Sequence, residues 1–166
     1  MEASLLLGKT VRAIWLFRSD GVHPAWVGEL TLPIVGFDAV LEFADGDLIR
    51  ITPCEVDWGP DRYPGLGLAL QPCTTEALHF ISPSGHIVEA VPLAEAAPFL
   101  PFSIAGIKES DPLGEDTVSQ YSLVTGNGWQ VTFRHMFPPM TLGMHVEIMG
   151  GTPNNSFKPN PLRGSA

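Results

Sequence analysis

The sequence contains little cysteine, little charge and no long apolar run. Its two cysteines stand 19 positions apart among 166 residues and form no Cys-x-x-Cys pair, so no disulfide framework or zinc site is predicted. No segment approaches the about 18 consecutive apolar residues of a membrane span, and the N-terminus lacks the basic start of a signal peptide. We therefore expect a cytoplasmic protein without membrane association, in which Cys54 and Cys73 are reduced core thiols.

Recognised catalytic patterns are also missing. The segment Pro83-Ser84-Gly85-His86 lacks the Gly-x-Ser-x-Gly elbow of a serine hydrolase and is typical of a turn. Gly65-Leu66-Gly67 is too short for a phosphate-binding loop. The histidines have no metal-ligand spacing, and they stand at His23, His79, His86, His135 and His145. No catalytic residue, metal ligand or cofactor is predicted.

Turn residues are abundant and favour an all-β chain. Seventeen glycines and sixteen prolines are scattered singly along the sequence. Two hairpins are expected, at 40–51 and 121–133, around the dipeptides Asp45-Gly46 and Asn127-Gly128, which suit type I′ turns. With two-residue turns, Phe43 would face Leu48, and Val124 would face Val131.

Further strands are expected from β-branched, aromatic or alternating segments. Short helical turns are expected at 4–7 and, between two prolines, at 93–97. The fold prediction is a barrel or sandwich of roughly ten short, bent strands in a single domain over 1–151, followed by a tail over 152–166 without periodicity. The remaining predicted strands are 11–17, 26–32, 66–70, 77–81, 86–91, 102–107 and 141–148.

An internal repeat is a second level of organisation. A shift of 82 positions superposes Leu41 on Leu123 and Asp45-Gly46 on Asn127-Gly128. The order of patterns agrees between the halves 9–91 and 99–149, and two such halves would pack about a pseudo-twofold axis. The alternative is a chance recurrence of common β patterns.

The net charge of −9 bears on partners. Residues 1–151 contain all 18 acidic residues and seven of the nine basic ones, so the body of the chain carries −11. Such a body repels phosphate backbones, which bind through lysine and arginine. The charge favours a protein partner over nucleic acid.

Two segments are candidate binding surfaces. The loop that contains Trp58, Asp61 and Tyr63 is the densest polar and aromatic cluster, and it is typical either of a binding loop or of a well-packed corner. The second segment contains His135, Phe137 and Pro138. If exposed, its rigid apolar surface would suit a partner; the alternative is a structural crossover between a hairpin and the last strand.

One part of the chain resembles a known family. The motifs Leu7-Gly8-Lys9-x-Val11, Asp20-Gly21, Gly28-x-Leu30 and Gly46-Asp47-Leu48-Ile49-Arg50, within residues 5–56, resemble those of Sm-like proteins. The resemblance implies a short helix before the five bent strands of a small barrel, which in that family assembles into rings and binds RNA. It assigns no binding residue here. The tail resembles a repeat-derived extension of unrelated bacterial proteins, which implies a bacterial source.

Three functional hypotheses follow. The first is a non-catalytic protein-binding module, similar to an immunity protein or antitoxin, whose acidic surface covers a basic site. The second is an Sm-like nucleic-acid module, which requires a basic patch around Lys9, Arg12, Arg18 and Arg50. The third is a small-ligand binder or enzyme with a pocket between the halves, using Asp57, Asp61 or His135. Each is compatible with an oligomer.

Overall fold

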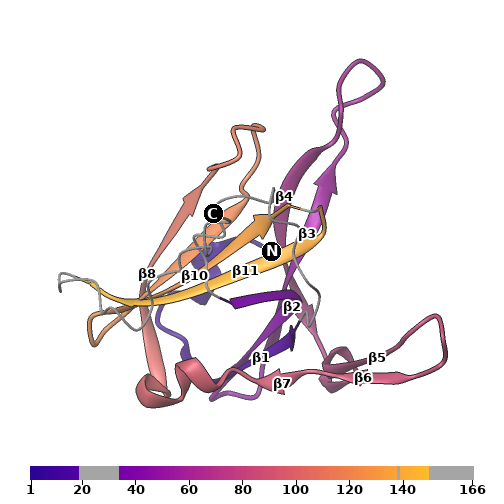
Figure 1. Ribbon diagram of the computed structural model, residues 1–166. Helices are drawn as coiled ribbons and strands as arrows, with labels where there is room; N and C mark the ends of the chain where they lie inside the picture. The colour runs from indigo at the N-terminus through magenta and orange to yellow at the C-terminus, as the bar shows by residue number, and fades with distance from the viewer. Residues whose placement is uncertain (19–33, 138, 150–166) are drawn as a thin grey trace, which may run out of the picture.

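The fold is all-β. The computed structural model describes residues 1–18, 34–137 and 139–149, so the expected strand 26–32, Pro138 and the tail 152–166 lie outside the described residues. The described residues form eleven strands and three short 3-10 helices (Figure 1). The strands of the main sheet are β1 (Thr10–Arg18), β2 (Ile34–Phe43), β3 (Leu48–Val56), β4 (Gly65–Cys73), β7 (Val91–Pro92), β8 (Phe102–Ser110), β9 (Gln120–Thr125), β10 (Trp129–Met136) and β11 (Thr141–Ile148).

Two antiparallel meanders build the molecule. One runs β1-β2-β3-β4 and the other β8-β9-β10-β11, and they are joined by pairing of β1 with β8 and of β2 with β11. These two junctions close β1, β2, β11, β10, β9 and β8 into a six-stranded antiparallel barrel. The predicted fold class is therefore confirmed as a barrel. Strands β3 and β4 extend the sheet beyond β2, and β7 pairs with the far part of β1.

Both predicted hairpins are present, but their predicted register is wrong by one residue. Leu41 pairs with Ile49, and Leu123 pairs with Val131. Each turn has three residues instead of two, and only its last residue, Gly46 (φ +93°) or Gly128 (φ +88°), has a positive φ. This is the geometry of a type I turn followed by a left-handed glycine, the usual three-residue hairpin loop. It needs one positive φ where a type I′ turn needs two.

The remaining predicted elements are largely confirmed. The strands expected at 11–17, 66–70, 102–107 and 141–148 correspond to β1, β4, β8 and β11. The segment 77–91 differs: η2 (Thr75–Leu78) precedes β5 (His79–Ile81), and the chain returns through β6 (Ile87–Glu89) as a separate two-stranded sheet. The predicted helical turns form as the 3-10 helices η1 (Ala3–Leu6) and η3 (Ala94–Phe99).

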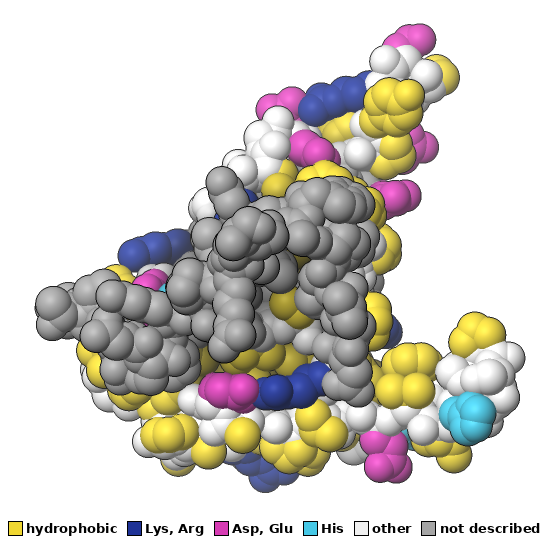
Figure 2. All heavy atoms as spheres, in the orientation of Figure 1, with side chains coloured by type: hydrophobic (Ala, Val, Ile, Leu, Met, Phe, Trp, Pro, Cys, Tyr) yellow, Lys and Arg dark blue, Asp and Glu magenta, His cyan; other side chains and the backbone are white. Residues whose placement is uncertain are grey.

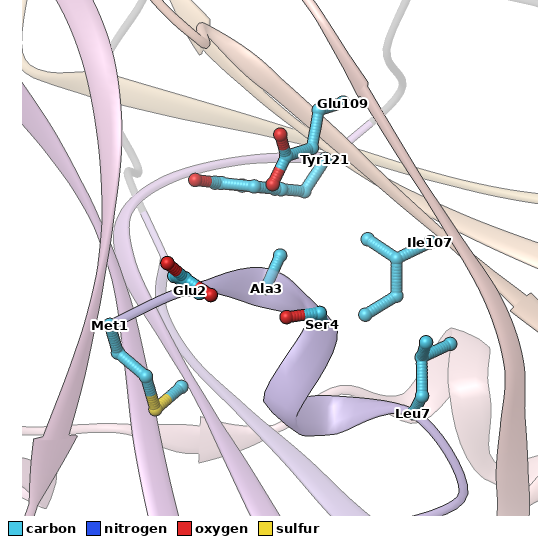
Figure 3. Close-up of a pocket in the computed structure, with 8 residues that line it drawn as sticks. All are labelled: Met1, Glu2, Ala3, Ser4, Leu7, Ile107, Glu109 and Tyr121. Carbon is cyan, nitrogen blue, oxygen red and sulfur yellow. The ribbon is translucent and has the colours of Figure 1, made fainter.

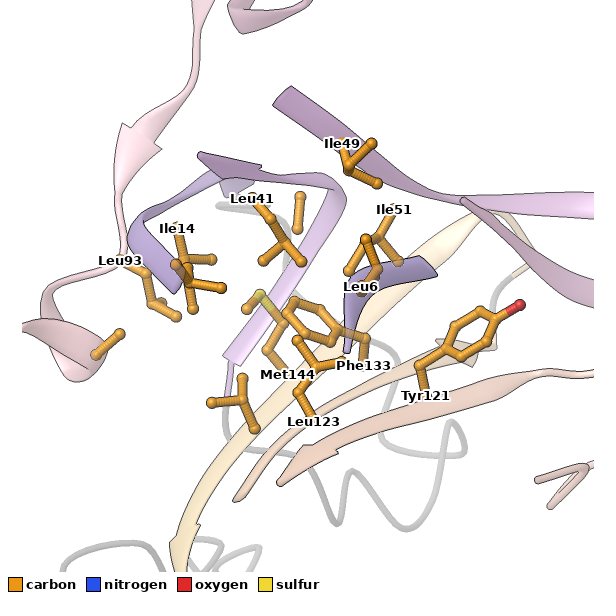
Figure 4. Packing of buried hydrophobic residues seen from close by; sticks show 14 of the residues in the cluster. Leu6, Ile14, Leu41, Ile49, Ile51, Leu93, Tyr121, Leu123, Phe133 and Met144 are labelled. Carbon is orange, nitrogen blue, oxygen red and sulfur yellow. The ribbon is translucent and has the colours of Figure 1, made fainter. Parts of the chain in front are cut away.

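The core fills the barrel with side chains from both meanders and from η1 (Figure 4). Leu41 and Leu123, which the 82-residue shift superposes, are both fully buried in it. Ile51 and Phe133, a second superposed pair, are also fully buried there. The two meanders thus share strand order, turn geometry and buried positions, whereas duplication of an ancestral half stays a prediction.

Candidate functional site

The loop between β3 and β4, residues 57–64, forms the tip of the projection at the upper right of Figure 1. It brings together Trp58, Asp61 and Tyr63, three of the residues singled out in the sequence. Tyr63 is 94% exposed and Trp58 is 40% exposed. The Arg62 guanidinium lies 5.0 Å from the centroid of the Trp58 ring, a cation–π contact. The loop therefore combines a cation–π contact between two exposed side chains with the exposed ring of Tyr63.

A second loop, residues 111–119 between β8 and β9, lies beside the first. Arg62 joins them, because its Nη2 donates to the carbonyl oxygen of Glu115 at 3.2 Å and to Oδ2 of Asp116 at 2.9 Å. The backbone N–H of Leu66 donates to Oε2 of Glu115 at 2.5 Å. Together we call residues 57–64 and 111–119 the acidic loops, since they contain five carboxylates and one guanidinium. Acidic side chains along the upper projection are visible in Figure 2.

Asp111 organises the second acidic loop. Its Oδ1 accepts hydrogen bonds from the Gly114 N–H and the Ser119 hydroxyl, and its Oδ2 accepts one from the Asp116 N–H at 2.8 Å. Desolvation alone would raise the pKa of Asp111. Hydrogen bonds from backbone N–H groups, of which that from Glu115 has the largest effect, outweigh desolvation and hold the pKa below its usual value. The ionised carboxylate therefore links Gly114, Asp116 and Ser119 within the loop.

Close backbone approach brings β4 against the acidic loops. A Cβ on Gly65 would stand 2.6 Å from Nε1 of Trp58 and 3.1 Å from the carbonyl oxygen of Glu115. A Cβ on Gly67 would stand 2.9 Å from Oγ1 of Thr117. Glycine is therefore required at both positions for the loops to pack as they do.

His135 does not belong to this exposed surface. It is fully buried in β10, where Nδ1 donates to the Gly67 carbonyl oxygen at 2.7 Å and Nε2 accepts the Met140 N–H at 2.9 Å. This pair of contacts requires the neutral ring with its proton on Nδ1. Burial lowers the pKa of His135 despite the bond to Gly67. The arrangement is that of a structural histidine, which ties β10 to β4.

Phe137, which follows β10, is exposed, as expected for the second candidate surface, and Pro138 lies outside the described residues. Asp57 belongs to the same loop as Asp61, where its Oδ1 accepts the Gly59 N–H at 2.8 Å. The structure thus separates the buried His135 from the exposed loop at 57–64 and from the exposed Phe137. Of the residues offered for a pocket between the halves, Asp57 and Asp61 lie in the exposed loop and His135 is buried in β10.

Sequence reasoning missed the β5–β6 arm as a surface. It projects at the lower right of Figure 1 and exposes Ile81 (71%) and Ile87 (67%). At its turn, Ser84 Oγ lies 2.9 Å from Nδ1 of His86, and the His86 N–H donates to Ser82 Oγ at 3.1 Å. These contacts stabilise the turn, in keeping with its predicted role. An apolar strand pattern cannot distinguish an exposed arm from a core strand, which is why the arm was missed.

Other features of the described residues limit the chemistry. Residues 1–18, 34–137 and 139–149 contain no group of three or more His, Cys, Asp or Glu able to hold a metal ion. Burial raises the pKa of the Cys54 and Cys73 thiols, which disfavours the nucleophilic thiolate. No described helix is long and apolar enough to cross a membrane.

Comparison with protein-family models, with curated proteins and with solved structures finds no match to the chain.

Proposed function

We propose that the chain is a non-catalytic protein-binding module of the bacterial cytoplasm, similar in role to an immunity protein or antitoxin, and that the acidic loops bind a basic surface of its partner. The observation that carries this proposal is the exposure of Tyr63 and Trp58 beside the carboxylates of both loops. Tyrosine and tryptophan are enriched among the residues that dominate interface energies.

The charge of the acidic loops supports a basic partner. Their five carboxylates share one guanidinium, and the whole chain carries −9. Such a field accelerates encounter with a positively charged surface and disfavours acidic competitors. Arg62 and Asp111 keep the loops ordered before binding, and preorganisation of this kind lowers the entropic penalty of association.

The test is partner capture with a matched pair of variants. The full chain, Tyr63→Ala and Leu5→Ala are each used to capture proteins from the native lysate at low salt. Leu5 is a suitable control because it is an exposed apolar residue on η1, outside the acidic loops. We expect one basic protein at near-equal stoichiometry with the unchanged chain and with Leu5→Ala, and its loss with Tyr63→Ala.

The same experiment can contradict the proposal. Undiminished capture by Tyr63→Ala would show that the acidic loops are not the interface. A partner retained equally in low and high salt would remove the electrostatic part of the argument, since exposed charges are screened within about 8 Å at physiological ionic strength. Absence of any stoichiometric partner would contradict the binding role itself.

The nucleic-acid alternative is not favoured by the surroundings of its four cations. Lys9 contacts Asp45 and Asp47, Arg12 contacts Glu42, Arg18 contacts Glu95 and Arg50 contacts Asp38. A cation already paired with a carboxylate must give up that partner before it can bind phosphate. We therefore expect no retardation of single-stranded RNA in a low-salt gel shift, and a salt-sensitive shift would instead support an Sm-like role.

A further inference from the structure

A separate cavity lies at the N-terminal side of the barrel, between η1 and the strands β8 and β9 (Figure 3). Its volume of about 590 Å³ is within the usual range of small-molecule sites, about 300–1,000 Å³. The lining comes from the chain start and from the second meander, and it includes no residue of the acidic loops. The residues are Met1, Glu2, Ala3, Ser4, Leu7, Ile107, Glu109 and Tyr121.

Tyr121 contributes an unpartnered polar group. The residue is only 7% exposed, and its ring joins the core cluster while the hydroxyl points away from Phe133 and Leu123 (Figure 4). Within residues 1–18, 34–137 and 139–149 that hydroxyl makes no hydrogen bond. Figure 3 shows it directed into the space above Glu2 and Ala3. The ring is buried but the hydroxyl oxygen is open to the cavity, so it is free to accept a hydrogen bond from a ligand bound there.

Two carboxylates, Glu2 and Glu109, border the same space. Neither takes part in an ion pair within the described residues, where Asp38, Glu42, Asp45, Asp47, Glu95 and Asp116 do. Lys108 precedes Glu109 on β8, but successive residues of a strand point to opposite faces, and Lys108 does not line the cavity. Among the lining residues, the N-terminal ammonium of Met1 is the one cation, and it donates to the Leu70 carbonyl oxygen at 3.3 Å; the two carboxylates therefore leave the cavity with a net negative charge.

Part of the wall is apolar. Ala3 and Leu7 from the η1 segment and Ile107 from β8 line the cavity together with the polar Glu2 and Ser4 (Figure 3). A hydrated metal ion gains nothing from such a wall, whereas a ligand with a hydrocarbon body buries apolar surface against it. The apolar wall, the hydroxyl and the carboxylates together suit a ligand that has one cationic end and one apolar end.

We propose that this cavity binds a small organic ammonium ion. The ammonium group lies between the Glu2 and Glu109 carboxylates and donates a hydrogen bond to the Tyr121 hydroxyl oxygen, while the hydrocarbon body packs against Ala3, Leu7 and Ile107. Charge-assisted hydrogen bonds of this type are the stronger class in proteins. The site includes no residue of the acidic loops, so a test of ammonium binding is independent of the proposed protein partner.

Calorimetric titration of the full chain with phenethylammonium tests the site. The neutral analogue 2-phenylethanol and the anionic analogue 3-phenylpropionate share its aromatic body, and calcium chloride tests for an inorganic ion. We expect saturable binding of phenethylammonium alone. Glu109→Gln should weaken it about tenfold, because the ammonium loses a charged partner, and Tyr121→Phe several-fold, because the ammonium loses an uncharged acceptor. Glu89→Gln, an exposed carboxylate of β6 outside the cavity, should leave binding unchanged.

Folding is monitored in the same variants by thermal unfolding. Tyr121→Phe should keep the wild-type melting temperature because the hydroxyl has no partner within the described residues, so a loss of binding reports the cavity. Equal binding of the neutral or anionic analogue, binding of calcium alone, or an undiminished affinity in Glu109→Gln would each overturn the proposal. Absence of saturable phenethylammonium binding would overturn it as well.

Discussion

At the scale of single residues, Gly36 controls how closely β1 and β2 approach. It pairs with Arg18, and a Cβ at this position would overlap the backbone carbonyl oxygen of Phe17 and would lie 2.8 Å from Cδ1 of Leu16. The backbone oxygen cannot move aside without opening the pairing of β1 with β2. The junction of β2 with β11 would open too, because Gly36 also pairs with Leu142 there.

Gly36→Ala should therefore destabilise the barrel by about 1–3 kcal/mol, the range for overpacking. The measurement is urea unfolding followed by tryptophan fluorescence. Gly126→Ala is the matched control, since a Cβ there meets nothing within 4 Å and its φ is not positive. Equal stability of the two variants would show that the close approach at Gly36 is not required.

His135 predicts a pH dependence of stability. Its pKa lies below the ordinary value of 6.5 in the folded chain because of burial, so the unfolded chain binds more protons as the pH falls. The free energy of unfolding should decrease as the pH drops below about 6.5 toward the folded-state pKa, and this histidine should contribute no slope above about pH 7.5. The measurement is urea unfolding at intervals between about pH 5 and about pH 8.

The control variants for this prediction separate titration from packing. His135→Gln cannot titrate, so it should lose this part of the slope, and at neutral pH it should be less stable by about 1–3 kcal/mol because Gly67 and Met140 lose their partner. His86→Gln, at the exposed turn of the β5–β6 arm, should keep the wild-type slope. A His135→Gln variant with an unchanged slope would contradict the assignment.

The sequence identified His135 as notable but could not choose between a binding and a core role. The core role depends on backbone contacts with Gly67, 68 positions earlier, and with Met140 in the following turn. Neither residue has a polar side chain that would indicate the contact in the sequence. For a similar reason, the sequence places Tyr121 only at the start of a hairpin arm. Its cavity forms because the chain start packs beside β8, a long-range contact that no local pattern encodes.

At the scale of elements, strands were predictable and turns were less so. Alternation and apolar runs located β1, β4, β8 and β11 because those patterns reflect burial of one or both faces. The dipeptides Asp45-Gly46 and Asn127-Gly128 suit two loop lengths, and the sequence does not distinguish them. The three-residue form pairs Leu41 with Ile49 and Leu123 with Val131, and these four side chains enter the common core.

The turn geometry gives a prediction for matched glycine variants. Gly46→Ala and Gly128→Ala should each destabilise the chain by about 1–2 kcal/mol, the penalty for a Cβ in the left-handed region. Gly126→Ala lies in the same turn as Gly128 without a positive φ and should have an effect of less than about 0.5 kcal/mol. Thermal unfolding of the three variants measures this. Equal effects at Gly126 and Gly128 would contradict the assigned turn.

At the scale of the whole molecule, all-β character and the order of the two halves could be read from the sequence, but closure could not. The barrel closes where β1 meets β8 through Val11 and Phe102, and where β2 meets β11 through Val35 and Gly143. Both contacts join segments about 90 or more positions apart, as the numbering shows. Composition limits the class of fold, whereas the choice between barrel and sandwich depends on these long-range pairings.

Closure between the halves predicts that neither half folds by itself. The core cluster contains Leu41 from the first meander and Leu123 from the second, and a four-stranded meander alone would leave that apolar face in water. The chain can be divided between Ser84 and Gly85, in the exposed turn of the β5–β6 arm, which contributes no residue to the core cluster. Fragments 1–84 and 85–166 then contain one meander each.

We expect each fragment alone to be unfolded by circular dichroism and to show poor amide dispersion in nuclear magnetic resonance spectra. An equimolar mixture should regain the spectrum of the intact chain, with a midpoint that depends on concentration because association is now bimolecular. Phe133→Ala in the second fragment should abolish this recovery, whereas Ile87→Ala, on the exposed arm, should not. Cooperative unfolding of either fragment by itself would mean that the two meanders are independent domains, and the shared core would then not be what determines the fold.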